Sequence, residues 1–239
     1  NSTILSISIL LIFNSDIGFW DTSNVTSIAG MFALCAVFNQ DISGWDVSNV
    51  IYTGNTFNGA TSFNQNIGNW DVSSMINATG MFSNTNFNQD ISGWDVSNLE
   101  APINMFQNNT AFNQDISGWN TSKFFTLGNM FDGASSFNQD ISGWDVSNAT
   151  SMNYVFQNAS AFNRDISSWD VSGVQSPYML FMFSGASSFN QDLSGWCVSN
   201  ITSEPTSFAT NSALTEANKP LWGTCPNYNI NVTASSNSD

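Results

Sequence analysis

The tryptophans of this chain follow one spacing from end to end. Nine of them occur, at Trp20, Trp45, Trp70, Trp94, Trp119, Trp144, Trp169, Trp196 and Trp222. The gaps between neighbours are 25, 25, 24, 25, 25, 25, 27 and 26 residues. A period this regular is typical of one supersecondary unit stacked on copies of itself, with the core buried between neighbouring copies. The sequence therefore predicts a solenoid in which each repeat forms one coil.

Each repeat carries the same large apolar residues at the same positions. A clean copy contains Met81, Phe82, Phe87, Ile91, Trp94 and Val96. The Phe of a recurring Phe-Asn pair stands at Phe13, Phe38, Phe63, Phe87, Phe112, Phe137, Phe162 and Phe189. A Met-Phe pair recurs with its Met at Met31, Met81, Met105, Met130 and Met182. These residues suffice to fill the inside of a coil, and we expect the aromatic rings to form spines through the stack.

The spacing of these apolar residues predicts the local structure. Intervals of four, three and two residues, broken by Gly and by Asn-Gln-Asp, suit a short strand, a corner and a short 3₁₀ or extended segment. We expect the strand around Gln89–Ser92 and the corner around Ser92–Asp95, where Gly93 would supply a positive φ. Stacked coils would pair their strands as a parallel sheet. The predicted fold is a mainly β solenoid of about nine 25-residue coils with short strands and 3₁₀ or turn segments.

One asparagine per repeat holds a common register. These residues are Asn39, Asn64, Asn88, Asn113, Asn138, Asn163 and Asn190. Identical amides one coil apart can stack and hydrogen-bond from coil to coil, which satisfies polar groups that the stack partly buries. We therefore expect an asparagine ladder along the solenoid.

The repeat also resembles that of a known family. The pattern Met-Phe-x-x-Ala-x-x-Phe-Asn-Gln-Asp-Ile-Ser-Gly-Trp-Asp-Val-Ser-Asn-Val-Thr-Ser-Met is similar to the 25-residue repeat of BspA-like surface proteins and of mycoplasma lipoproteins, a divergent branch of the leucine-rich-repeat clan. The resemblance covers about residues 13–200. It implies a right-handed, leucine-rich-repeat-like solenoid, secreted or on a cell surface, with a role in adhesion or surface display and no enzymatic activity.

The unbroken period favours a single solenoid over residues 1–239. We expect a degenerate apolar N-terminal coil at 1–19, regular repeats at 20–200, a degenerate C-terminal capping coil at 201–226 and a C-terminal strand or tail at 227–239. The apolar run at 4–13 is shorter than the about 20 residues that a membrane-spanning helix needs, so we expect no membrane insertion.

Charge and composition exclude several classes of function. The chain has three basic residues, no His and a net charge of −15, so we do not expect it to bind the phosphates of nucleic acid. Without His, general-base catalysis and the common nucleophilic triads have no candidate residues, and paired Asp residues repeat in every coil rather than marking one site. The sequence thus predicts a protein that is not an enzyme and needs no cofactor.

Two cysteines near the C-terminus are placed to form a disulfide. Cys197 follows Trp196 by one residue and Cys225 follows Trp222 by three, so both fall near the same corner of adjacent coils. A disulfide there would fasten the last coil and indicates an oxidising compartment. Cys35 occupies a position that holds Ala in other repeats, and we expect it to be a buried small residue.

Most aspartates form two columns. One column holds Asp16, Asp41, Asp90, Asp115, Asp140, Asp165 and Asp192, and the other holds Asp21, Asp46, Asp71, Asp95, Asp145 and Asp170. Stacked carboxylates repel one another, so each needs a compensating interaction. We expect each Asp to accept backbone N–H groups in an Asx turn. The alternative is Ca²⁺ held between coils, with Asp41, Asp90, Asp115 and Asp140 as candidate ligands.

Nine Asn-x-Ser/Thr sequons occur, about as many as the composition gives by chance. The candidate glycosylation sites are Asn24, Asn77, Asn108, Asn120, Asn148, Asn158, Asn200 and Asn231. Asn24, Asn148 and Asn200 each lie four residues after a Trp, on a turn expected to face solvent. We expect several sequons to carry N-linked glycans if the protein is secreted by a eukaryote.

The two ends suggest self-assembly. The interface would use the apolar N-terminal residues Ile4, Ile7, Ile9 and Leu11 and the alternating C-terminal residues Tyr228, Ile230 and Val232. A head-to-tail contact that does not close generates a filament. The sequence therefore favours an extracellular or cell-surface structural subunit that assembles through its ends. The alternative is a monomeric adhesin whose exposed face binds a ligand.

Overall fold

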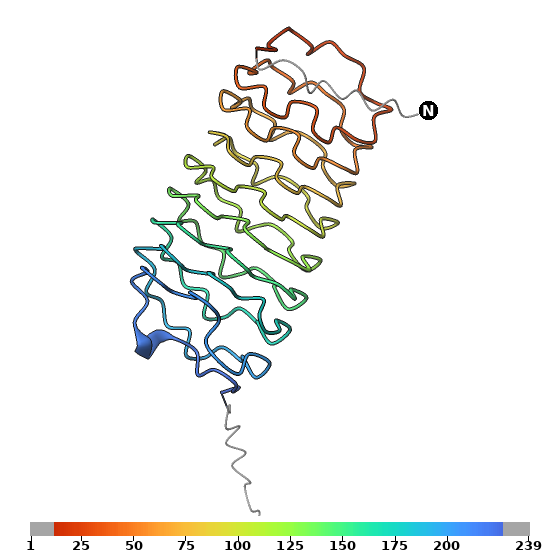
Figure 1. The fold of residues 1–239 in the computed structure, drawn as a ribbon. Helices are drawn as coiled ribbons and strands as arrows, with labels where there is room; N and C mark the ends of the chain where they lie inside the picture. The colour runs from red at the N-terminus through yellow and green to blue at the C-terminus, as the bar shows by residue number, and fades with distance from the viewer. Residues whose placement is uncertain (1–11, 227–239) are drawn as a thin grey trace, which may run out of the picture.

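The chain folds into a stack of similar coils. The computed structural model describes residues 12–226, and Figure 1 shows them winding from one end of an elongated stack to the other. One cluster of buried apolar residues runs without interruption from Ile17 to Leu214. The predicted segment 227–239, and most of the predicted coil 1–19, lie outside the described residues.

The prediction of a mainly β fold is wrong. Within residues 12–226 the structure has no strand and no sheet, and its single helix is the 3₁₀ helix η1, Glu216–Asn218. Strand-type pairing within these residues is limited to isolated parallel bridges, which join Ser27 to Tyr52, Tyr52 to Asn77, Asn77 to Ala101, and Thr126 to Ser151. The coils are instead built almost entirely from turns.

Hydrogen bonding in the Met-Phe segment explains why no strand forms there. We use this name for residues 27–34 of the first complete coil and their equivalents in later coils. The N–H of Phe131 donates to the carbonyl of Val155 in the following coil at 3.0 Å, whereas the N–H of Asp132 donates back to Asn129 in its own coil at 3.2 Å. Two residues per segment are left-handed, as at Asn129 (φ 56°) and Gly133 (φ 71°). Alternating turn and inter-coil bonds, with left-handed residues four apart, exclude a continuous extended strand.

The strand predicted around the Asn-Gln-Asp stretch is replaced by side-chain bonds. The backbone N–H of Asn138 donates to the Oδ1 atom of Asn113 at 2.9 Å, and that of Asn163 donates to Asn138 Oδ1 at 3.0 Å. The Nε2 atom of Gln139 donates to the Asn113 carbonyl at 2.8 Å. Because a side chain stands between the two backbones, they do not pair directly. The predicted asparagine ladder is confirmed, but each amide oxygen accepts the backbone N–H of the next ladder residue rather than its side-chain amide, and some, such as Asn113 Oδ1, also accept the amide N–H of the adjacent Gln.

Aromatic residues fill the coils as the repeat predicts. The rings of Phe131 and Phe137 stack within one coil at 4.0 Å, and Phe131 stacks on Phe156 of the next coil at 5.8 Å. Each interior Trp also donates its indole N–H to a carbonyl of the preceding coil, as from Trp119 to Ile91 at 3.2 Å. The same bond is made by Trp45, Trp70, Trp94, Trp144, Trp169 and Trp196. Tryptophan therefore both packs the core and ties each coil to its neighbour.

The predicted role of the corner glycines is wrong. Gly44, Gly93, Gly118, Gly143 and Gly195 all lack a positive φ, and a Cβ atom built on any of them would meet nothing within 4 Å. Five left-handed glycines lie instead in the Met-Phe segment, as at Gly133, and Gly223 follows Trp222 in the last coil. A turn closed by an i to i−3 bond, such as Trp94 N–H to Ile91 at 3.1 Å, forms the corner without a left-handed residue.

We expect Gly133→Ala to lower the free energy of unfolding by about 2 kcal/mol or more, because a left-handed Ala costs about 1–2 kcal/mol and its Cβ would also collide with the Asn108 amide. The matched control is Gly143→Ala, where φ is ordinary and the space is open. That change should cost nothing or add a few tenths of a kcal/mol. Urea unfolding followed by tryptophan fluorescence measures both, and equal losses in the two variants would contradict the prediction.

Candidate functional site

The aspartate columns form the most regular feature of the exposed surface. In the first column, Asp140 Oδ1 accepts the backbone N–H of Ser142 at 3.0 Å. In the second column, Asp145 Oδ1 accepts both the N–H of Ser147 at 3.0 Å and its hydroxyl at 2.6 Å. The backbone bond recurs at Asp16, Asp21, Asp41, Asp46, Asp71, Asp90, Asp95, Asp115, Asp165, Asp170 and Asp192. The predicted Asx turns are confirmed.

These turns lower the pKa of several aspartates in both columns. The Ser147 hydroxyl, and next its backbone N–H, hold the pKa of Asp145 below the ordinary aspartate value. At Asp115 the N–H and hydroxyl of Ser117 lower the pKa, and repulsion from Asp140 and Asp90 raises it by less. Hydrogen bonding therefore outweighs repulsion between coils.

The columns do not assemble a metal site. Among the residues that the structure describes, no group of three or more His, Cys, Asp or Glu side chains lies close enough to hold an ion. The four candidate ligands, Asp41, Asp90, Asp115 and Asp140, come from four different coils, and each accepts a turn N–H. The structure thus gives the calcium alternative no supporting geometry.

We expect Asp145→Ala to lower the free energy of unfolding by about 1 kcal/mol, because the Ser147 N–H and hydroxyl lose an acceptor. Asp145→Asn is the matched control, since Asn120 in the same register accepts the same two bonds from Ser122. That variant should unfold close to the parent.

The difference in the free energy of unfolding between the parent and Asp145→Ala should depend on pH, because the pKa of Asp145 is lowered in the folded protein. The carboxylate's contribution is fully present above the unfolded pKa near 3.8 and is lost as the pH falls through the lower folded value. The gap between the parent and Asp145→Ala should therefore narrow below pH 3.8 in urea titrations. A gap that widens on acidification would contradict this assignment.

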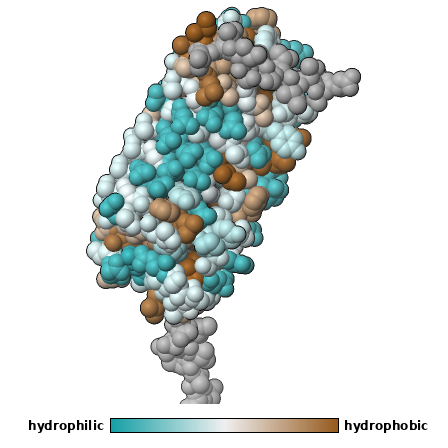
Figure 2. Space-filling view, in the orientation of Figure 1, coloured by the Kyte–Doolittle hydropathy of each residue, from teal (hydrophilic) through white to brown (hydrophobic). Residues whose placement is uncertain are grey.

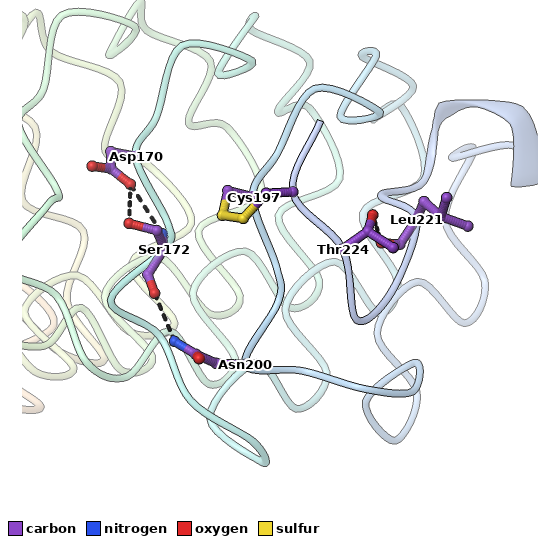
Figure 3. Close-up of a disulfide and its surroundings, with 7 residues drawn as sticks. Asp170, Ser172, Cys197, Asn200, Leu221 and Thr224 are labelled. Carbon is purple, nitrogen blue, oxygen red and sulfur yellow. Dashed lines mark hydrogen bonds between the residues drawn. A yellow bond between two sulfur atoms is a disulfide. The ribbon is translucent and has the colours of Figure 1, made fainter. Parts of the chain in front are cut away.

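The predicted glycosylation sites differ in exposure and bonding. Asn24, Asn108, Asn120, Asn148, Asn158 and Asn200 are exposed, Asn77 is half-buried, and Asn231 lies outside the described residues. The Nδ2 atom of Asn200 donates to the Ser172 carbonyl at 2.9 Å (Figure 3), and Asn148 donates likewise to Ser122 at 2.7 Å. Asn120 uses only its Oδ1 atom and makes no Nδ2 bond to any residue in 12–226. Among Asn120, Asn148 and Asn200, the amide nitrogen of Asn120 is therefore the most accessible.

The C-terminal coil is fastened covalently. The structure forms the predicted disulfide between Cys197 and Cys225, which are 28 residues apart (Figure 3). Lys219 next to η1 pairs with Glu204 at 2.8 Å and with Glu216 at 2.7 Å. Cys35 is a buried free thiol, as predicted, and burial raises its pKa.

The N-terminal end of the described part of the stack is apolar. A hollow of about 350 Å³ is lined mainly by Phe19, Trp20, Thr22, Val25 and Met31. Figure 2 shows hydrophobic residues gathered at this end. The Thr22 hydroxyl is buried and finds no partner among residues 12–226. This hollow was not predicted from the sequence, because its shape depends on how the side chains of the first described turns pack.

The interface residues predicted from the sequence cannot be placed in this hollow. Ile4, Ile7, Ile9, Leu11, Tyr228, Ile230 and Val232 all lie outside the described residues. No helix within 12–226 has the length and apolar character needed to span a bilayer.

Comparison with known proteins identifies a family but no activity. No curated protein matches the chain. A solved structure titled "Crystal structure of TLR13-ssRNA13 complex" is 14% identical with a TM-score of 0.26, and the match covers 83% of this chain and 33% of that one. The present chain therefore spans about a third of that protein, and so distant a likeness supports no functional argument. The model of the family described as "Mycoplasma protein of unknown function, DUF285" matches residues 8–119 and 101–222. Because these segments cover most of the sequence, the chain belongs to the DUF285 family.

Proposed function

We propose that this protein is an extracellular structural repeat protein, an N-glycosylated subunit of a surface fibre or matrix. The observation that carries the proposal is the uniformity of the aspartate and asparagine surface. The same side chains make the same bonds in coil after coil, as Asn113 does to Asn138 and Asn138 does to Asn163. A catalytic or tailored binding site needs residues that differ from their equivalents elsewhere, whereas a scaffold does not. The absence of His and the scarcity of basic residues further favour a protein that is neither an enzyme nor a nucleic-acid binder.

The disulfide supports the extracellular location. Disulfides persist in oxidising compartments and are rare in the cytosol. The pair Cys197–Cys225 fastens the end of the stack, where a solenoid otherwise exposes its core. The sequence resemblance to BspA-like surface proteins is consistent with the same location.

Glycans would coat the exposed turns. We propose Asn24, Asn108, Asn120, Asn148, Asn158 and Asn200 as the acceptors, since all six are exposed. Attachment consumes one amide N–H, so Asn120, whose Nδ2 makes no bond within the described part of the chain, should be occupied most completely. Half-buried Asn77 should be occupied least.

The test combines electron microscopy with mass analysis of the native material. Negative-stain images should show regular fibres, and enzymatic deglycosylation should reduce the intact mass. Single short rods at high protein concentration, with no mass loss, would overturn the proposal. Fibres without mass loss would remove glycosylation from it and leave the structural role.

One observation favours a second candidate, a monomeric adhesin. Exposed aromatic side chains occur in a strip at and beside the isolated bridges. Tyr52, which takes part in two bridges, is 49% exposed, and Phe125, next to Thr126, is 47% exposed. Tyr178, whose carbonyl accepts the N–H of Met152, is also 47% exposed. Residues in this strip vary from coil to coil, unlike the aspartate columns, and such variation suits recognition of a ligand. Single rods that bind host or matrix material, and that lose binding in Tyr52→Ala and Phe125→Ala, would establish the adhesin instead.

A further inference from the structure

Two neighbouring Met-Phe segments, 151–158 and 178–185, depart from the pattern of the others. Their first left-handed position holds Tyr154 (φ 60°) and Phe181 (φ 54°). In the other coils the same position holds Gly, Asn or Ser, and these residues are Gly30, Asn55, Gly80, Asn104, Asn129 and Ser207. A bulky residue in the left-handed region is strained, and strained residues cluster at binding sites. The two aromatic residues therefore point to a role beyond the repeat itself.

The length of the repeat changes at the same place. Tyr178 and Ser151 open equivalent segments, because each carbonyl accepts an N–H of the preceding coil, at 2.7 and 3.1 Å. Ser151 follows Asp145 by six residues, whereas Tyr178 follows Asp170 by eight. Two extra residues thus precede Tyr178, and residues 175–178 are all exposed. The insertion brings an aromatic side chain to the surface beside the strained pair.

Three aromatic rings are fixed in this region. The rings of Tyr154 and Phe181 stack with their centroids 5.1 Å apart and their planes 13° from parallel, and both residues are half-buried. The backbone N–H of Tyr178 donates to the Gln175 carbonyl at 2.7 Å, which closes the turn that carries its 47% exposed side chain. The N–H of Tyr154 donates to the Leu180 carbonyl at 2.8 Å and ties the two segments together. We call Tyr154, Tyr178 and Phe181 the aromatic site.

The chain enters both segments from the second aspartate column. Asp145 precedes the first segment and Asp170 precedes the second, and both are exposed. Asp170 Oδ1 accepts the N–H of Ser172 at 3.0 Å and its hydroxyl at 2.6 Å (Figure 3). The carboxylates are thus held in place by their own turns and leave a second oxygen for other partners.

The basic residues of the chain do not offset this charge. The sequence has 18 acidic residues and three basic ones. Lys123 and Arg164 each donate to an Asn of the preceding coil, at 2.6 and 2.7 Å. Within residues 12–226 ion pairs are made by Lys219 alone, which contacts two carboxylates, Glu204 at 2.8 Å and Glu216 at 2.7 Å. The formal net charge of −15 therefore favours a cationic partner.

We propose that the aromatic site binds an Arg- or Lys-rich segment of a partner protein. The cationic side chains of that segment lie over the exposed ring faces, where the negative face of each ring attracts them. The aspartate column supplies attraction at longer range and raises the rate of encounter. The inference goes beyond the proposed structural role, because such a site serves a single rod and a fibre subunit equally.

Two variants remove the aromatic site without removing the fold. Phe181→Asn restores the residue type that this position holds at Asn55, Asn104 and Asn129, so the left-handed backbone is retained. Tyr178→Ala removes an exposed ring from the end of the turn. Tyr52→Ala is the matched control. Tyr52 is 49% exposed and opens the equivalent segment 52–59, where no aromatic residue follows at the left-handed position.

The experiment measures binding of a synthetic peptide that alternates Arg and Gly to the full chain by isothermal titration calorimetry. The parent should bind it at low salt and more weakly as salt rises. Phe181→Asn and Tyr178→Ala should each weaken binding about tenfold, the effect of losing one cation–π contact. Tyr52→Ala should bind as the parent does, and a peptide with Glu in place of Arg should not bind. Circular dichroism of each variant verifies that the fold is retained.

Every other outcome overturns the inference. Equal affinity in the parent and all three variants would mean that the acidic surface as a whole attracts the peptide. An equal loss in Tyr52→Ala would assign recognition to the whole strip rather than to this site. No binding at low salt would exclude a cationic partner. A neutral soluble glucan that binds in place of the peptide, with loss in Phe181→Asn and Tyr178→Ala, would make the site one for carbohydrate. None of these results bears on fibre formation, which tests the proposed function separately.

Discussion

Replacing Trp119 by Ala is expected to lower the free energy of unfolding by about 3–5 kcal/mol, the range for removing a large buried aromatic side chain. Trp119 is only 4% exposed, and its ring stacks on Trp144 at 6.3 Å. Its loss also leaves the Ile91 carbonyl without the indole N–H that it accepts at 3.2 Å. Because Trp119 lies in the middle of the stack, its loss weakens the contacts of its coil with both the preceding and the following coil.

The loss expected for Trp119→Ala combines lost packing and a lost hydrogen bond, and two further variants separate these contributions. Trp119→Phe keeps an aromatic ring but removes the indole N–H. The Ile91 carbonyl still accepts the Trp94 N–H at 3.1 Å, so we expect a loss of about 0.5–1.5 kcal/mol, the net contribution of one hydrogen bond. Trp20→Ala should cost less than Trp119→Ala, since Trp20 is only partly buried and no described coil precedes it. Urea unfolding followed by far-ultraviolet circular dichroism measures all three. A Trp119→Ala variant as stable as Trp20→Ala would show that the indole ladder contributes little.

Removing the disulfide is expected to cost on the order of 3–4 kcal/mol, from the entropy of closing a loop of this length in the unfolded chain. The bond joins Cys197 to Cys225, 28 residues apart, and no other covalent link holds the last coil within the described residues. The double variant Cys197→Ser/Cys225→Ser should unfold at lower urea concentration than the parent. Reductant should bring the parent to the level of the double variant and leave the double variant unchanged.

Cys35→Ala serves as the control for thiol chemistry. Cys35 is buried and unpaired, and its position holds Ala60 and Ala134 in other coils, so the change should cost about 1 kcal/mol or less. Its response to reductant should match that of the parent. A parent whose stability does not change on reduction would contradict the stabilising role of the disulfide.

The sequence predicted the core better than the backbone. The residues that fill the coils follow directly from the period, and Phe87 and Trp94 are buried as expected. The strand prediction failed because the same spacing of apolar residues fits two backbone arrangements. The two arrangements differ in what the backbone N–H of Asn113 binds. In the structure it donates to the side-chain Oδ1 atom of Asn88 at 2.9 Å, whereas in a sheet it would donate to a backbone carbonyl. Hydrophobic periodicity carries no information on that choice.

The exposed turns also include features that the sequence predicted and features that it did not. The Asx turns were predictable because Asp followed two residues later by Ser is a local signal, read within three residues of Asp145. The left-handed residues of the Met-Phe segment were not predicted, although they recur in every coil, as at Asn55 and Tyr154. Tyr rarely adopts this conformation, and only the stacked context imposes it.

The identity of successive coil interfaces bears on how such a gene can change in length. The bond from Asn138 to Asn113 and the bond from Asn163 to Asn138 are interchangeable, as are the stacked phenylalanines beside them. Recombination that duplicates or deletes one whole repeat between, for example, Trp119 and Trp144 would rejoin surfaces that already fit. A deletion of a few residues would instead move Phe and Trp out of register with the coils on both sides. Copy number should therefore vary more freely among related genes than the length of each repeat, which stays between 24 and 27 residues in this chain.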